Sequence, residues 1–200
     1  IVIQIKFKKM KSLKITLVVA VAALFSFTVV EQYTYSVDTV HSRIGFSIKH
    51  LGINDQNGSF DKFDTKITTT KADFSDAVIE FSAEASSVNT GNEMRDGHLQ
   101  SPDFFDEAKY PTLSFKSTSF KKIKGNEYQI KGDFTFHGVT KPVVLKAIHG
   151  GNFENPETKK VITAFKISGV VKRSEHNVAV GFPGLSDEVN LLADLEFARN

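Results

Sequence analysis

The sequence predicts an all-β domain in which eight antiparallel strands surround an apolar interior. Three observations indicate this fold class. Apolar and polar residues alternate with a period of two in eight segments after residue 30, and turn-forming residues separate most of these segments. Fifteen of the eighteen phenylalanines lie in the same part of the chain, interleaved with Ala, Gly, Ser and Thr. One segment, at about 91–108, breaks the alternation and has a helical pattern.

Each predicted strand places apolar side chains on one face. In the first, for example, Ile44, Phe46 and Ile48 share a face, because successive side chains of a strand point to opposite sides of the sheet. The predicted strands are 43–51, 59–69, 77–85, 112–120, 128–136, 142–149, 161–171 and 188–197.

Two local features refine the first hairpin. Asn57-Gly58 is a strong signal for a tight turn between the first two strands. In 59–69, the apolar phase changes between Phe60 and Phe63, which suggests a β-bulge near Asp61.

Eight antiparallel strands either pack as two sheets or close into a barrel, and alternation alone leaves both open. Closure removes exposed sheet edges, and an eight-stranded barrel can enclose one small ligand. Large aromatic rings with little small aliphatic filler favour an apolar tunnel. A sandwich core filled by the same rings is the alternative.

The interruption predicts a short helix followed by a closing loop. Thr90 and Glu93 stand at capping-box spacing, so the helix is expected over about 92–99, before Ser101-Pro102. Two adjacent aromatics, Phe104 and Phe105, are not both expected to face water. The segment is therefore expected to form a lid or plug at one barrel end.

The first thirty residues predict a cleavable signal peptide. Five lysines and no acidic residue precede or adjoin the uncharged run ITLVVAVAALFSFTVV at 15–30. The run is shorter than the roughly 20 residues of a membrane-spanning helix, although a retained anchor is the alternative. Met10 is a plausible start, so residues 1–9 are expected to be upstream sequence. The folded domain is then 31–200.

The composition excludes several classes of function. After residue 30, 20 basic residues face 23 acidic ones, which is not the basic footprint of a nucleic-acid binder. The absence of Cys removes thiol catalysis and Cys-based metal sites. No nucleotide-binding or hydrolase motif is present, so neither cofactor nor catalytic group is expected. No metal site is expected either, because none of the histidines has the spacing of a metal-binding motif: His41, His50, His98, His137, His149 and His176.

Several strings together resemble the YceI-like family of exported bacterial proteins. They are VDTVHSRIGFSIKHLG at 37–52, GSFDKFD at 58–64, SSVNTGNEMRDGHLQSPDFFDEAKYPTLSFKST at 86–118, GDFTFHGVTKPVVL at 132–145 and KRS at 172–174. The resemblance runs from about residue 33 to 198. It implies a lipocalin-like, extended eight-stranded barrel in the periplasm that holds a long amphiphile, such as a polyisoprenoid or fatty-acid derivative.

The resemblance also directs attention to individual positions. The opening Asp38-x-x-His41-Ser42 and the pair Phe104-Phe105 match the family's signature, as does Arg95-Asp96-x-His98-Leu99 in the predicted helix. After KRS the family often continues with Asp-Phe-Gly, whereas this chain has Glu175-His176-Asn177. The expected ligand-binding residues are Phe46, Ile48, His50, Phe60, Phe63, Phe81, His98, Phe104, Phe105, Phe115, Phe134, Phe136, Phe165 and Leu191.

The predicted function is therefore a non-enzymatic lipid-binding protein that transports, stores or sequesters its ligand. One alternative is an enzyme acting on an isoprenoid-like substrate, with Arg95, Asp96 and His98 as the working groups. The other is a ligand-free structural or stress-response protein with a filled interior. This last alternative includes a homodimer formed through an outer sheet face.

Overall fold

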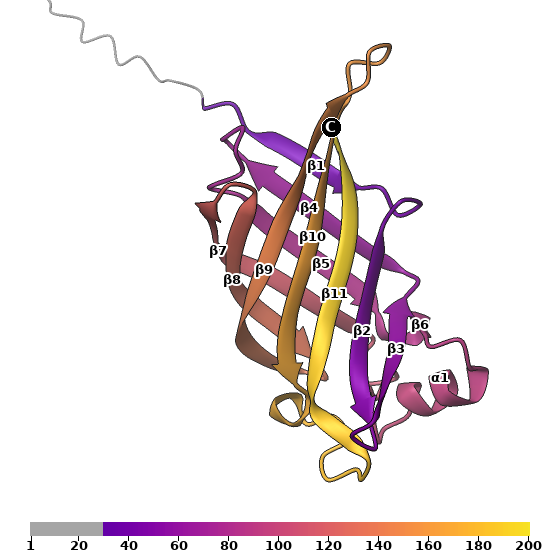
Figure 1. Ribbon diagram of the computed structural model, residues 1–200. Coiled ribbons are helices and arrows are strands. Elements are labelled where there is room, and N and C mark those ends of the chain that lie inside the picture. Colours follow the sequence, from indigo (N-terminus) through magenta and orange to yellow (C-terminus); the bar gives the residue numbers. More distant parts are fainter. Residues whose placement is uncertain (1–29) are drawn as a thin grey trace, which may run out of the picture.

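The computed structural model describes residues 30–200 and shows an antiparallel β-barrel with one short helix (Figure 1). The predicted signal peptide lies almost entirely outside the described residues. The strand segments are β1 Tyr33–Val37, β2 Arg43–His50, β3 Asn54–Phe60, β4 Phe63–Thr69, β5 Val78–Glu84, β6 Val88–Asn89, β7 Thr112–Lys124, β8 Glu127–Phe136, β9 Val139–Glu154, β10 Val161–Lys172 and β11 Leu185–Arg199. The helix α1 is Glu93–Gln100, and two 3₁₀ turns are Ala85–Ser87 and Arg173–His176.

Eight of these segments form a closed ring, which confirms the barrel over the sandwich. The order around the ring is β1-β4-β5-β7-β8-β9-β10-β11, and β11 pairs with β1 to close it. The other three, β2, β3 and β6, continue in that order from a second stretch of β11. β2 follows β1 after a turn at 38–42, and β4 follows β3 after a break of two residues (Figure 1).

The predicted hairpin turn at Asn57-Gly58 is wrong, because both residues lie inside β3. The chain turns instead at Leu51 and Gly52, both with positive φ. Gly58 pairs with Phe46 of β2, and a Cβ at Gly58 would lie 2.4 Å from Cζ of the Phe46 ring. The glycine therefore makes room for an aromatic ring. The break between β3 and β4 falls at Asp61 and Lys62, where the apolar phase changes.

The helix is present as predicted, but its cap is a different residue. Asn92, and not Thr90, caps α1, with its Oδ1 accepting the Arg95 amide hydrogen at 3.0 Å. The Thr90 amide and hydroxyl donate instead to Asp96 Oδ1, at 2.9 and 2.5 Å. Thr90 thus ties the start of the segment to the middle of the helix.

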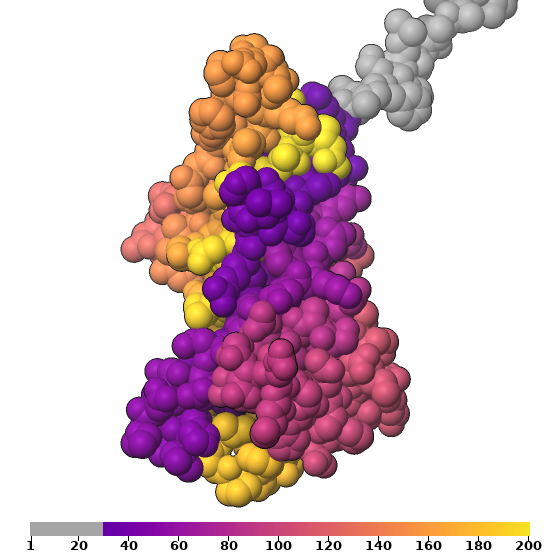
Figure 2. Space-filling view, turned by 90° about the vertical axis from the view of Figure 1, so that its right-hand side faces the viewer, coloured from indigo at the N-terminus to yellow at the C-terminus, as the bar shows by residue number. Residues whose placement is uncertain are grey.

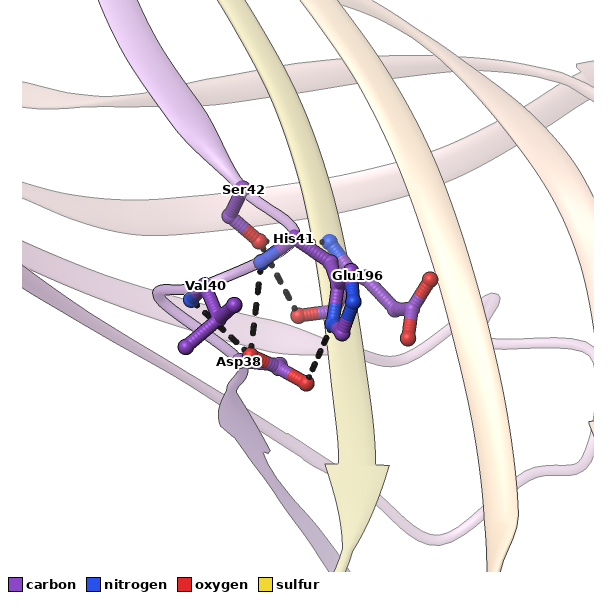
Figure 3. Close-up of polar contacts among 5 residues, drawn as sticks. All are labelled: Asp38, Val40, His41, Ser42 and Glu196. Carbon is purple, nitrogen blue, oxygen red and sulfur yellow. Dashed lines mark hydrogen bonds and ion pairs between the residues drawn. The ribbon is translucent and has the colours of Figure 1, made fainter.

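The corner between β1 and β2 is fastened to β11 (Figure 3). The Asp38 amide donates to the Glu196 carbonyl at 2.8 Å, and the Glu196 amide donates to Ser42 Oγ at 2.8 Å. Within the corner, His41 Nδ1 lies 2.9 Å from Asp38 Oδ2. That hydrogen bond lowers the pKa of Asp38 and raises the pKa of His41. The Asp38-x-x-His41-Ser42 motif thus fastens the turn between β1 and β2 to β11.

A cluster of aromatic side chains fills one end of the barrel. Phe74, in the loop between β4 and β5, is 1% exposed, and its ring lies 5.3 Å from those of Phe165 and His149. The Tyr128 hydroxyl donates to the Asp73 carbonyl at 2.8 Å, which fixes that loop over the end. We call this cluster the aromatic plug; it consists of Tyr35, Phe74, Phe120, Tyr128, His149, Phe165 and Phe197.

The plug makes the stability of the fold depend on pH through His149. Burial lowers its pKa, and Lys122 acts in the same direction, while a hydrogen bond with Asn152 opposes them. The unfolded chain therefore takes up a proton near pH 6.5 that the folded chain resists, so acidification below that value favours unfolding. In His149→Gln, we expect the midpoint of chemical denaturation to fall less between pH 7 and pH 5 than it does in the wild type. His41→Asn is the control with the opposite sign, because the raised pKa of His41 contributes stability at low pH; a curve unchanged by His149→Gln would contradict the assignment.

Close strand packing predicts an asymmetric response to glycine substitution. A Cβ at Gly132 would lie 2.4 Å from the Phe115 ring and 2.5 Å from the Lys116 carbonyl oxygen, whereas one at Gly97 in α1 would meet nothing within 4 Å. Gly132→Ala is expected to lower the free energy of unfolding by about 1–3 kcal/mol through overpacking. Gly97→Ala is expected to raise it by up to about 1 kcal/mol. Chemical denaturation measures both, and equal effects would refute the packing described.

Candidate functional site

The barrel interior beyond the aromatic plug is a cavity of about 560 Å³. Its walls are the inward faces of the long strands, and its other end is lined by residues of α1, of β2 and β3 close to the turn that joins them, and of the loop before β11. Phe46, Ile48 and Leu191 point inward yet are only partly buried, because they face the cavity. The inward-facing apolar side chains that predicted the strands therefore also line a space large enough for a ligand.

Twelve of the fourteen residues expected to bind the ligand line this cavity. They are Phe46, Ile48, His50, Phe60, Phe81, His98, Phe104, Phe105, Phe115, Phe134, Phe136 and Leu191. Phe165 does not, because it lies within the aromatic plug at 1% exposure. Phe63 packs against the buried core at the start of β4 without lining the cavity. Both are therefore core residues in this structure.

Phe104 and Phe105 close the side of the cavity near α1, as the sequence predicts for a lid or plug segment. Both are buried, and Phe105 packs against Phe60 of β3 and Phe136 of β8, with ring centroids 6.1 and 5.0 Å away. Phe104 contacts the rings of His98 and Phe182, at 4.8 and 5.2 Å. The segment thus contacts both β3 and β8, which are not neighbours in the sheet.

Arg95 brings a positive charge to the open end. Its guanidinium donates to Gln56 Oε1 at 2.8 Å and to the hydroxyl and carbonyl oxygens of Thr90 at 2.7 and 2.9 Å. All of these partners are neutral, and Arg95 forms no ion pair with a carboxylate in residues 30–200. Arg95, Gln56 and Thr90 all line the cavity. A guanidinium with no direct ion pair in residues 30–200 therefore faces the open end of the cavity, and the Asp96 carboxylate is linked to it only through the Thr90 hydroxyl.

The three groups weighed as catalytic do not converge on the cavity. Arg95 and His98 line it, but Asp96 does not, because its carboxylate accepts both hydrogen bonds from Thr90. The carboxylate thus holds the segment before the helix, and it neither orients the His98 imidazole nor pairs with Arg95.

A second arginine lines the cavity, and its only signal in the sequence is its place in the KRS string at 172–174. Arg173 is 9% exposed, and its guanidinium donates only to backbone carbonyls of the following loop and of β11. The acceptors are the carbonyls of Val178, Ala179, Phe182, Leu185 and Ser186. Carbonyls of an irregular loop have no sequence pattern, so only the folded chain reveals them. Arg173 shapes this loop at the open end.

Two further polar groups face the apolar interior. His176 is 1% exposed, and its Nδ1 donates to the Val139 carbonyl at 3.0 Å while its ring packs 5.3 Å from that of Phe134. The position where the family often has Phe is thus part of the cavity wall. Thr65 also lines the cavity, is 2% exposed, and its hydroxyl has no hydrogen-bond partner within the described structure.

In the described part of the chain, one cluster has side chains suited to a metal ion, and it lies outside the cavity. Asp38, His41 and Glu196 offer ligand atoms within 4.8 Å of one another. They belong to the corner in Figure 3, where the backbone of Glu196 is hydrogen-bonded to that corner and His41 is paired with Asp38. Between residues 30 and 200, no helix has the length and apolarity required to span a bilayer.

Comparisons with known proteins agree with this architecture. The family model described as YceI-like domain matches residues 35–197. The protein YceI of Escherichia coli O157:H7 is 35% identical over 168 residues, which cover 84% of this chain and 87% of that protein. A crystal structure of the Campylobacter jejuni YCEI protein superposes with a TM-score of 0.67 at 33% identity, covering 74% of this chain and 87% of that one.

A third comparison shows the same fold at lower identity. The structure described as a polyisoprenoid binding domain from Saccharophagus degradans superposes with a TM-score of 0.60 at 15% identity, covering 82% of this chain and 97% of that one. The match of a family model to most of the chain, together with relatives above 30% identity over most of their length, shows the family. This chain belongs to the YceI-like domain family.

Proposed function

We propose that this protein is a non-enzymatic, periplasmic lipid-binding protein that holds a long-chain amphiphile inside the barrel for transport, storage or sequestration. The observation that carries the proposal is the cavity of about 560 Å³, which has an apolar wall, a plugged end and polar groups at the other end. The Saccharophagus degradans domain with the same fold is described as polyisoprenoid binding, which supports an isoprenoid or similar chain. The predicted signal peptide supports export.

The geometry favours one orientation of the amphiphile. Its chain extends between the inward phenylalanines toward Thr65 and the plug, and its polar head lies near Arg95, Gln56 and His98. Transfer of the chain from water contributes roughly 0.8 kcal/mol per buried CH₂, before the costs of ordering. The free N–H groups of Arg95 suit a carboxylate or phosphate head, because charge-assisted hydrogen bonds are stronger than neutral ones. The chain supplies affinity, and the head fixes direction.

Filling the cavity tests the proposal directly. Ala193 of β11 lines the cavity next to its partner on the adjacent strand, Ile44 of β2. Ala193→Trp therefore places a large ring where the lipid chain would lie. Val170→Trp, on the exposed outer wall, is the matched control. Protein purified from the periplasm of its own host is analysed by native mass spectrometry and then by lipid extraction. We expect one bound lipid per wild-type or Val170→Trp molecule and at least a tenfold loss in Ala193→Trp. A full complement of lipid in Ala193→Trp, or none in the wild type, would contradict the proposal.

The orientation of the head group has its own test. In Arg95→Gln, we expect the affinity for a long-chain fatty acid to fall about tenfold, because a charge-assisted hydrogen bond is lost. The affinity for the fatty alcohol of equal length should change less than twofold. Displacement of a fluorescent lipid measures both. An equal loss for acid and alcohol would mean that Arg95 only holds the cavity entrance in shape.

A further inference from the structure

Exposed apolar side chains surround the open end of the cavity. Ile53 is 83% exposed, Met94 87% and Val180 65%, and each protrudes from a different segment: the β2–β3 turn, α1, and the loop 177–184. We call this set the apolar rim; it consists of Leu51, Ile53, Met94, Val180 and Phe182. In Figures 1 and 2 the three segments lie together at the lower end of the molecule, opposite the β9–β10 hairpin.

The rim is continuous with the cavity wall. Phe182 belongs to both, since it lines the cavity and is 41% exposed, and its ring centroid lies 6.3 Å from that of His98. Met94 precedes His98 by one helical turn, so both lie on the same face of α1. The Leu51 amide donates to the Gly184 carbonyl at 2.6 Å, which joins the β2–β3 turn to the loop. An apolar path therefore leads from the surface into the barrel.

We propose that the apolar rim docks this end of the barrel onto the surface of a zwitterionic phospholipid bilayer, so that the lipid passes between bilayer and cavity without crossing water. The proposal rests on the proposed lipid-binding function and adds the surface from which the ligand is taken or to which it is delivered. The aromatic plug blocks the opposite end, so the lipid passes through the rim. Exposing its chain to water costs roughly 0.8 kcal/mol per CH₂, which direct contact with a bilayer avoids.

The form of the rim fits a bilayer better than a protein partner. Stable protein interfaces need a contiguous, complementary patch in which aromatic and arginine side chains are packed at the centre. Here single, mostly aliphatic side chains protrude from three separate tips, with the cavity between them. Such side chains enter the boundary between lipid head groups and acyl chains without needing a matching shape, because burial there depends on apolar area.

The charges at the rim select the kind of bilayer. Lys49 is paired with Asp55 at 2.9 Å. Glu93, the first residue of α1, and Glu175, in the 3₁₀ turn before the loop, are both exposed. Arg95 is partly buried, and its guanidinium is hydrogen-bonded to Gln56 and Thr90 inside the opening. The rim therefore has no cluster of exposed lysine and arginine such as segments that bind anionic lipids carry. Docking is driven by apolar burial, so it should persist at high salt.

Co-sedimentation with phosphatidylcholine vesicles tests the proposal. The variant is Ile53→Asp with Val180→Asp; neither residue lines the cavity. The control is Phe153→Asp, which removes a 58% exposed aromatic near the β9–β10 hairpin at the opposite end. All proteins carry the same N-terminus, so residues 1–29 cannot cause a difference between them. We expect wild type and control to bind vesicles at low and high salt, and the double variant to lose at least fivefold in bound fraction.

Each other outcome has a defined meaning. Equal vesicle binding by the double variant and wild type would overturn the proposal, as would no binding by the wild type. Wild-type dimers that the double variant disperses, without vesicle binding, would assign the rim to a second copy instead. Melting temperature checks the fold, and Ile53→Ser with Val180→Ser replaces the aspartates if they destabilise it. If extraction yields no lipid but rim substitutions still abolish vesicle binding, the proposed lipid-binding function fails and the docking surface stands.

Discussion

The division of β11 between two partners is the constraint on which the rest of the structure depends. Near its end, β11 pairs with β1 and closes the ring, while its longer first part pairs with β2. Glu196 lies at the junction, hydrogen-bonded to Asp38 and Ser42. Since β3 pairs beyond β2 only with the two-residue β6, the sheet is not closed by hydrogen bonds at the cavity end. The segment around α1 covers that gap and forms the entrance.

The same residue type serves two purposes along the barrel axis. Phe165 of β10 and Phe134 of β8 both point into the barrel. Phe165 lies in the aromatic plug, whereas Phe134 lies in the cavity wall. The difference arises because Phe74, from the loop between β4 and β5, fills the axis at one end only. The cavity wall is not purely apolar between these two regions, because the Thr65 hydroxyl and the His176 ring also line it.

Most of the fold and cavity wall were predictable because strands have a strict period. Twelve of the expected ligand-facing side chains line the cavity, since alternation fixes which face of a strand points inward. Alternation carries no information on depth along the barrel, which is why Phe165 was placed in the cavity. The prediction of a turn at Asn57-Gly58 is wrong for a related reason. The sequence does not distinguish a glycine that makes room for the Phe46 ring from a glycine that allows the chain to turn.

The sequence by itself determined the all-β class, the inward faces, the helical insertion and the family, because these depend on local periodicity and on motifs read along the chain. Only the tertiary structure decided where the cavity ends, which cations face it and which residues surround its entrance. Arg95 meets Gln56 across 39 positions of sequence, and Arg173 collects carbonyls from an irregular loop. Contacts between distant, non-periodic segments exist only once the barrel has closed, and they determine the chemistry of its open end.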